Sequence, residues 1–211
     1  MCRFKSAIIL KDRVFITDVD SHTELLEQLK IADTKENAEK LFVRAELYPE
    51  NNDMFSDINN WVFNVDQDIL PEWFVKEYDK QRMVKAVKKW AENHIYIDKE
   101  NIEVSGTVYL KNCKNVSCNN STVYAYGNST VYAYDNSTVY AYGNSTVEAY
   151  NNSTVYAYDN STVEAYNNST VVITIHSSNK KENIKLSDNA TLKDRKTKTI
   201  YQSGDWKFER V

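Results

Sequence analysis

The chain has 211 residues and a mass of 24.5 kDa, which allows one ordinary domain or two small ones with at least one buried core. It carries 26 basic and 30 acidic side chains, and residues 1–104 hold 15 Lys and Arg against 21 Asp and Glu. An acidic body argues against nucleic-acid binding, because phosphate neutralisation needs clustered cations. No apolar run approaches the roughly 20 residues that span a bilayer, so we expect no membrane association.

The compartment that the sequence predicts is the cytoplasm. The first residues, MCRFKSAIILKDR, lack the run of about 7–15 apolar residues that a secretory signal requires. Three cysteines, Cys2, Cys113 and Cys118, are too few for a disulfide framework and are expected to be reduced thiols. The Asn-Ser-Thr triplets are formally glycosylation acceptors, but we attribute them to turn chemistry.

Residues 1–98 are predicted to form an α+β globular domain, in which helices cover a small antiparallel sheet. A hairpin over residues 4–10 and 14–17 comes first, and Ser21-His22-Thr23-Glu24 is a capping box that opens a helix. A short helix near residues 34–40 is followed by strands over 41–48 and 61–65. Pro71 fits the first turn of a helical region. A last helix over about residues 79–94 has the buried stripe Met83, Val87, Trp90, Ala91 and His94.

This N-terminal domain contains no glycine. Loops that cradle phosphate groups need close backbone approach, which glycine provides. The sequence therefore has neither a Walker motif nor a dinucleotide-binding fingerprint, and we predict no cofactor.

Cys2 is the first candidate catalytic residue. Removal of Met1 would leave a cysteine with both a thiol and a free α-amine, which can act together as nucleophile and base. In this respect Met1-Cys2 followed by a strand resembles class II glutamine amidotransferases and other N-terminal nucleophile hydrolases, which implies an amidohydrolase or transferase. Those enzymes typically have glycine after the cysteine, where this chain has Arg3.

Other candidate residues of this domain have ordinary structural interpretations beside the functional ones. His22 could serve thiol or phosphoryl chemistry, or simply lie in the first turn of its helix. Arg44 and Glu46 share one face of a strand and could line a ligand pocket, or form ion pairs on a solvated sheet. Two acidic pairs, at 18/20 and 66/68, could hold Mg²⁺ if the fold joins them, but such pairs are more often turns and caps. We predict no metal site.

From Asn120 the sequence repeats every eight residues, as NSTVYAYG, NSTVYAYD, NSTVYAYG, NSTVEAYN, NSTVYAYD and NSTVEAYN, and the pattern ends in NSTVVITI at Ile175. Small or apolar residues alternate with large or polar ones within each unit, which is the period of a strand. Each unit begins with Asn after Gly, Asp or Asn, and these residues tolerate turn conformations. Each octad is therefore predicted to be one short strand and one corner.

Two octads are predicted to form one coil. Glu replaces Tyr at positions 148 and 164, sixteen residues apart, whereas Tyr124, Tyr140 and Tyr156 keep the other phase. This pattern predicts a two-sided parallel β-solenoid over residues 99–178, with clean octads over 120–175 and coils about 4.8 Å apart. Ser, Val and Ala point inward, and Thr and Tyr point outward. The outward residues of one face form the candidate binding surface: Thr122, Thr138, Thr154, Tyr124, Tyr140, Tyr156, Tyr126, Tyr142 and Tyr158.

Degenerate rungs are expected between residues 101 and 119, and residues 179–211 are predicted to form a β-rich cap. Terminal units of a solenoid must be atypical, because a bare end exposes strand edges that recruit other chains. The cap is predicted to contain short strands and a hairpin near Ser203-Gly204-Asp205, with Trp206 and Phe208 available to seal the core.

The segments MCRFKSAIILKDR and DSHTELLEQL, followed by octads and a Trp-containing terminus, resemble a family of proteins of bacteriophages and bacterial mobile elements. This resemblance implies a setting, in the cytoplasm of a host cell, and no mechanism. The leading hypothesis is a non-enzymatic binding or scaffold protein with a host or phage protein as partner, and self-association is left open. The Cys2 enzyme is the alternative. A third hypothesis is ice binding, because flat solenoids with Thr or Tyr ladders resemble some antifreeze proteins.

Overall fold

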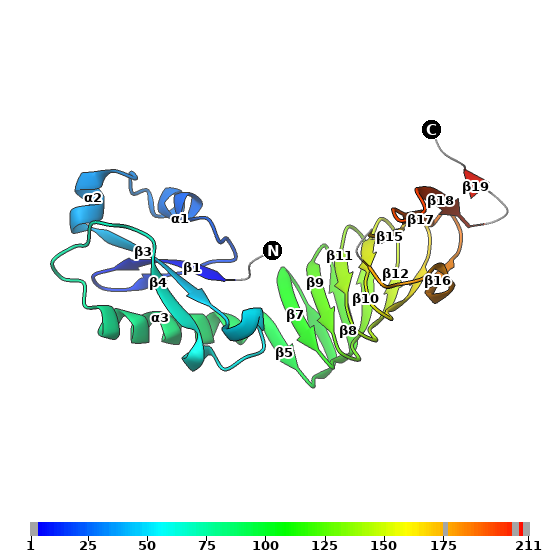
Figure 1. Cartoon of the computed structure of the whole chain (residues 1–211), viewed down its shortest axis with the longest axis horizontal. Helices are drawn as coiled ribbons and strands as arrows, with labels where there is room; N and C mark the ends of the chain where they lie inside the picture. The colour runs from blue at the N-terminus through cyan, green and yellow to red at the C-terminus, as the bar shows by residue number, and fades with distance from the viewer. Residues whose placement is uncertain (1–3, 175–176, 204–206, 209–211) are drawn as a thin grey trace. The chain divides into compact units, whose positions relative to one another are not determined.

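The computed structural model describes residues 4–174 and 177–203, and the backbone of 207–208 (Figure 1). The chain divides into two compact units, Met1–Asn93 and His94–Val211. The division lies a few residues before the predicted boundary at 98/99, because the solenoid ladder already begins at Ile95.

The N-terminal unit contains the predicted antiparallel sheet, with strand order β2-β1-β3-β4. Its strands are β1 (Lys5–Leu10), β2 (Val14–Phe15), β3 (Phe42–Tyr48) and β4 (Val62–Val65). Two short 3-10 turns, η1 (Glu50–Asn52) and η2 (Ile58–Asn60), lie between β3 and β4.

Helices cover both faces of this sheet (Figure 1). Helix α1 (His22–Leu29) begins after Ser21, whose hydroxyl accepts the backbone N–H of Glu24 as the capping box predicts. Helix α1 and the short helix α2 (Lys35–Lys40) pack on the sheet face that carries Ile8 and Phe42. Helix α3 (Lys76–Ala91) contacts β1 and β2 and buries Met83 and Val87.

Two details of the last helix differ from the prediction. Residues after Pro71 form a turn in place of a helix, because the N–H of Phe74 donates to the carbonyl of Pro71. Helix α3 starts at Lys76, where the buried carboxylate of Asp79 accepts the N–H of Val75. The helix ends at Ala91, so His94 lies outside it, at the start of the solenoid unit.

The C-terminal unit is the predicted parallel β-solenoid with two sheets and about five turns of about 16 residues. The first sheet has nine strands, of which seven are parallel: β5 (Ile95–Ile97), β7 (Thr107–Lys111), β9 (Thr122–Tyr126), β11 (Thr138–Ala141), β13 (Thr154–Ala157), β15 (Thr170–Ile173) and β17 (Thr191–Asp194). The second sheet has six parallel strands: β6 (Glu100–Val104), β8 (Lys114–Asn119), β10 (Thr130–Tyr134), β12 (Thr146–Ala149), β14 (Thr162–Ala165) and β16 (Ile184–Leu186).

The narrow core between the sheets consists of the small inward residues, as predicted. The inward valines and alanines of the clean octads, from Val123 to Val171, are at most 1% exposed. The degenerate rungs contribute Val104, Val108, Leu110, Val116 and Cys118 to the same core. Serines next to the corners are also buried, and most of them donate hydrogen bonds to backbone carbonyls; Ser153 Oγ, for example, lies 2.7 Å from Tyr150 O and 3.1 Å from Ala133 O.

The corners have left-handed backbone, which explains the residues that precede each repeated Asn. The φ angles there are positive at Gly127 (67°), Asp135 (56°), Gly143 (65°) and Asn151 (59°). Glycine adopts such angles without steric cost, and Asn and Asp tolerate them better than other residues. Asn and Asp side chains also form ladders between coils, for example between Asn151 Nδ2 and Asp135 Oδ1 at 2.8 Å.

The two ends of the solenoid depart from the sixteen-residue spacing. Ile102 pairs with Val116, fourteen residues later, and Val163 pairs with Ile184, twenty-one residues later. The segment predicted as a cap thus begins with two further rungs, β16 and β17. Strands β18 (Thr199–Gln202) and β19 (Lys207–Phe208) then continue the nine-stranded sheet in antiparallel orientation. The predicted turn at Ser203–Asp205 lies partly, and the Trp206 and Phe208 side chains wholly, outside the described residues.

Candidate functional site

The outer surface of the nine-stranded sheet carries tyrosines in columns. In the first column Tyr109, Tyr124, Tyr140 and Tyr156 stack with ring centroids 4.8–4.9 Å apart and interplanar angles of 7–11°. In the second column Tyr126, Tyr142 and Tyr158 stack at 4.6–4.7 Å. We call these seven tyrosines, together with the adjacent column of threonines, the tyrosine face. The threonine column is Thr107, Thr122, Thr138, Thr154, Thr170 and Thr191.

The stacking is a direct consequence of the register. Coils pair residue i with residue i+16, so each tyrosine lies beside its own equivalent at the spacing of neighbouring strands. That spacing suits offset stacking of aromatic rings. Partial burial in the stack, with the neighbouring Tyr124 and Tyr156 phenols, raises the pKa of Tyr140. The phenol of Tyr140 is therefore neutral at physiological pH.

The six-stranded sheet has a different outer surface. It also has a tyrosine column, Tyr134, Tyr150 and Tyr166, with centroids 4.9–5.1 Å apart. Beside this column lie Glu148 and Glu164, which accept hydrogen bonds from the hydroxyls of Tyr150 and Tyr166 at 2.5 and 2.8 Å. Lys185 forms an ion pair with Glu164. This surface is thus charged, whereas the outward positions of β9, β11 and β13 are all Thr or Tyr.

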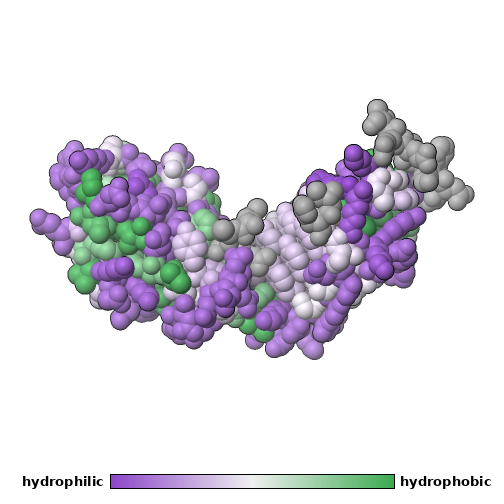
Figure 2. Space-filling model, in the orientation of Figure 1, coloured by the Kyte–Doolittle hydropathy of each residue, from purple (hydrophilic) through white to green (hydrophobic). Residues whose placement is uncertain are grey.

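Figure 2 shows the hydropathy of one side of the solenoid unit. The coloured part of the solenoid unit is mostly pale there, the colour of side chains of intermediate hydropathy, with strongly hydrophilic residues toward its rim. Tyr and Thr belong to this intermediate class, with one apolar part and one hydroxyl each.

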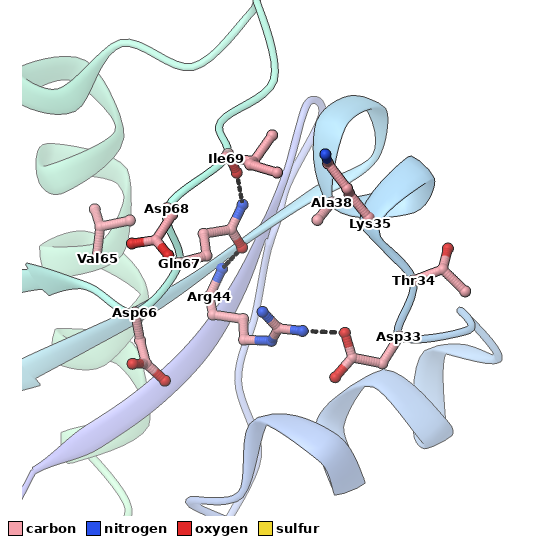
Figure 3. A pocket seen from close by; sticks show the side chains of 10 residues that line it. All are labelled: Asp33, Thr34, Lys35, Ala38, Arg44, Val65, Asp66, Gln67, Asp68 and Ile69. Atoms are coloured by element: carbon pink, nitrogen blue, oxygen red, sulfur yellow. Dashed lines mark hydrogen bonds and ion pairs between the residues drawn. The ribbon is translucent and has the colours of Figure 1, made fainter.

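The N-terminal unit has a pocket of about 530 Å³ at the ends of β3 and β4 (Figure 3). Arg44 extends across it and forms an ion pair with Asp33, and Gln67 lies beside the strand between Arg44 N and Ile69 O. The lining residues are Asp33, Thr34, Lys35, Ala38, Arg44, Val65, Asp66, Gln67, Asp68 and Ile69.

Arg44 and Glu46 share one strand face, as predicted, but the structure gives them different surroundings. Arg44 lines the pocket, whereas Glu46 does not line it and lies beside His22 and Asp66, the latter also a lining residue. The donor and acceptor atoms of His22, Glu46 and Asp66 all lie within 4.8 Å of one another. His22 Nδ1 lies 3.2 Å from Asp66 Oδ2, and His22 Nε2 lies 3.2 Å from the carbonyl oxygen of Ala45.

Three elements position this group. His22 is the first residue of α1, Glu46 lies in the middle of β3, and Asp66 follows β4. Glu46 pairs with Asn64, so Asp66, two residues later, returns to the same face of the sheet. The sequence interpretation named His22, Glu46 and an acidic pair containing Asp66, but it did not bring the three together.

The two acidic pairs do not form a common site. Asp20 binds the buried Lys5 at 2.7 Å, and Asp18 accepts a hydrogen bond from Trp90 Nε1. Among the described residues, the one group of three metal-ligating side chains is that of His22, Glu46 and Asp66.

The other candidate residues named from the sequence are either buried in the solenoid or lie outside the described residues. Cys2 is outside the described residues, as is His176. Cys113 and Cys118 are buried and free, and burial raises the pKa of Cys118 to about 11.

Within the described part of the chain, no helix is both long and apolar enough to cross a bilayer. Comparisons with protein-family models, with curated proteins and with solved structures found no match.

Proposed function

We propose that this chain is a non-enzymatic binding protein whose tyrosine face contacts a partner protein, with the solenoid as a rigid scaffold. The observation that carries the proposal is the array of seven ring-stacked tyrosines on one sheet of the solenoid. Tyrosine is enriched at protein interfaces, because its ring supplies apolar area and its hydroxyl supplies a hydrogen bond.

The order of the array supports binding with a small entropic cost. Association ordinarily immobilises interface side chains at about 0.5–1.5 kcal/mol each. Tyr124 and Tyr140 are already held between two stacked neighbours and Tyr156 against one, so most of this cost is met when the chain folds. Rigid aromatic side chains act in the same way at antibody paratopes.

The absence of charge over β9, β11 and β13 supports contact through this sheet in preference to the other. Outward residues of these three strands are Thr and Tyr only, so a partner would desolvate no ionised group there. On the six-stranded sheet a partner would have to desolvate Glu148 and Glu164.

The setting that we propose is the cytoplasm of a bacterial host, with a host or phage protein as partner of a phage- or mobile-element-encoded chain. The buried thiols of Cys113 and Cys118, both free, support a reducing compartment. The N-terminal unit then contributes a second recognition surface, for which the pocket beside Arg44 is the candidate.

The test compares two triple variants of the full chain that differ only in the sheet they change. The first replaces Tyr124, Tyr140 and Tyr156 by Ser, and the second replaces Tyr134, Tyr150 and Tyr166 by Ser. Immobilised wild-type chain and both variants are exposed to bacterial cytoplasmic extract, and the affinity of a retained protein is then measured with purified components. Circular dichroism establishes that all three chains are folded.

We expect the first variant to bind the retained protein about tenfold more weakly or worse, a loss of about 1.4 kcal/mol. The second variant should bind as the wild type does. Equal binding by all three chains, or no retained protein with the wild type, would contradict the proposal.

Ice binding is a second candidate, favoured by the column of six threonines in register on the tyrosine face. It is tested by thermal hysteresis of the full chain, with Thr138→Val and Thr154→Val as a double variant. Hysteresis that the double variant lowers would support it, and no hysteresis would exclude it.

A further inference from the structure

We propose that His22, Glu46 and Asp66 form a binding site for a divalent transition-metal ion such as Zn²⁺. This inference concerns the N-terminal unit and is independent of the function proposed for the solenoid. It rests on the position of three ligand atoms, on the tautomer of His22 and on the hydrogen bonds that hold the group from outside.

The tautomer of His22 follows from its contact with the main chain. A backbone carbonyl only accepts hydrogen bonds, so the ring nitrogen Nε2, at 3.2 Å from Ala45 O, carries the hydrogen. In the neutral imidazole the other nitrogen, Nδ1, then has a lone pair. Metal-binding histidines almost always donate their second N–H to a carbonyl or carboxylate in this way.

The lone pair of Nδ1 faces a carboxylate oxygen. Asp66 Oδ2 lies 3.2 Å from it, and the Glu46 carboxylate lies within 4.8 Å of both groups. A lone pair and two anionic carboxylates at these distances repel one another unless a cation lies between them. A proton on Nδ1 or a metal ion can meet this requirement.

The distances fit a metal ion as well as a proton. Zn²⁺ binds nitrogen and oxygen ligands at about 2.0–2.1 Å in tetrahedral geometry, which places two ligands about 3.3 Å apart. The separation of His22 Nδ1 and Asp66 Oδ2 is already close to this value. Glu46 would complete the group by moving closer, because its carboxylate lies within 4.8 Å of the other two ligand atoms.

Hydrogen bonds from outside the group fix Glu46 as well. Its oxygen Oε2 accepts the hydroxyl of Tyr48 and the amide of Asn64, the latter at 3.4 Å. Carboxylates that bind metals are commonly held by such partners. With a bound ion, the protein would supply three ligands, and the remaining positions would be open toward solvent on the side of Asp66, whose side chain is 58% exposed.

The ligand set indicates which ions the site would take. One imidazole and two carboxylates, without a thiolate, suit Zn²⁺, Mn²⁺ or Co²⁺ better than Cu⁺. Mg²⁺ and Ca²⁺ prefer oxygen ligands throughout, so they should bind more weakly.

The experiment titrates the full chain, freed of metal with a chelator, with Zn²⁺. The side-chain nitrogens of its three histidines are observed by ¹H–¹⁵N NMR, and Co²⁺ is used in parallel for its visible absorption. We expect a shift of the Nδ1 resonance of His22 that saturates at one ion per chain, with His94 and His176 unchanged. The Co²⁺ spectrum should lack thiolate charge-transfer bands, which would exclude Cys2 as a ligand.

Variants then test each ligand by calorimetry. His22→Gln, Glu46→Gln and Asp66→Asn should each lower Zn²⁺ affinity by at least about a hundredfold, and Tyr48→Phe by about ten- to a hundredfold. Asp68→Asn is the matched control, since Asp68 lines the pocket without belonging to the group, and should bind as wild type. An unshifted His22 resonance in the wild type, or unchanged affinity in all three ligand variants, would overturn the proposal.

Discussion

Replacing one tyrosine in the middle of a stack should destabilise the solenoid about twice as much as replacing one at its end. Tyr140 stacks on Tyr124 at 4.8 Å and on Tyr156 at 4.9 Å, so Tyr140→Ala removes two ring pairs. Tyr156 has Tyr140 on one side and Val172 on the other, so Tyr156→Ala removes one ring pair.

The expected magnitudes follow from counting these pairs. A favourable aromatic pair on a sheet contributes about 0.5–1 kcal/mol. Loss of stacking should therefore lower the free energy of unfolding by about 1–2 kcal/mol in Tyr140→Ala and by about half of that in Tyr156→Ala. The change in strand propensity is the same in both variants and cancels in the comparison. For a chain of this size, about 1 kcal/mol corresponds to a change in Tm of roughly 2–4 °C.

The double variant supplies a second, sharper number. Tyr140→Ala and Tyr156→Ala each remove the pair that joins the two rings, so the sum of the single effects counts that pair twice. The double variant should be less destabilised than the sum by about one pair, or about 0.5–1 kcal/mol.

Calorimetry and circular dichroism measure these effects on the full chain, and calorimetry separates the transitions of the two units. The matched control is the pair Tyr150→Ala and Tyr166→Ala, which removes rings from the other sheet. Equal destabilisation by Tyr140→Ala and Tyr156→Ala, together with additive effects in the double variant, would show that the stacked rings contribute nothing as pairs.

Three further predictions concern the corners, the core and the tyrosine hydroxyls. Gly143→Val should lower the free energy of unfolding by at least about 1–2 kcal/mol, because φ is 65° and the new Cβ would lie 3.1 Å from Gly127 O. Gly143→Asn should lower it less, since Asn tolerates a positive φ better than Val does. Cys118, with its pKa raised by burial to about 11, should resist a thiol-specific reagent at pH 8 until the chain unfolds, as peptide mass spectrometry would show. Hydrogen bonds to Glu148 and Glu164 raise the pKa values of Tyr150 and Tyr166. The stabilising effect of these hydrogen bonds is complete below about pH 10 and is lost at higher pH. The Tm should therefore fall above about pH 10, and it should fall less in Glu148→Gln.

The solenoid could be predicted in detail, because the same eight-residue pattern recurs many times in its sequence. Alternation within each octad determines which side chains are buried, and Glu at 148 and 164 indicates the length of a coil. The unequal coils at the two ends could not be predicted in this way. The last coil contains an insertion before Ile184, where the buried Asn179 binds the backbone oxygen and hydroxyl of Ser161, and no repeated pattern indicates such a contact.

The group in the N-terminal unit could be predicted only in part. Strand alternation places Arg44 and Glu46 on one face, and the capping box places His22 in the first turn of α1. Contact between His22 and Asp66 spans 44 residues and depends on the register of β3 with β4 and on the packing of α1. A single sequence gives no local signal for either, so the sequence alone could not place Asp66 beside His22.

The register of sixteen also determines how the chain can change length during evolution. Near-identical repeats are prone to gain or lose copies, and each coil pairs only with the coil before it and the coil after it. Gain of two octads lengthens the rod by one strand spacing, about 4.8 Å, and keeps every tyrosine on its own side. Gain of a single octad would transfer all later residues to the opposite side and bring glutamates into the tyrosine stack. Lineages should therefore differ by even numbers of octads.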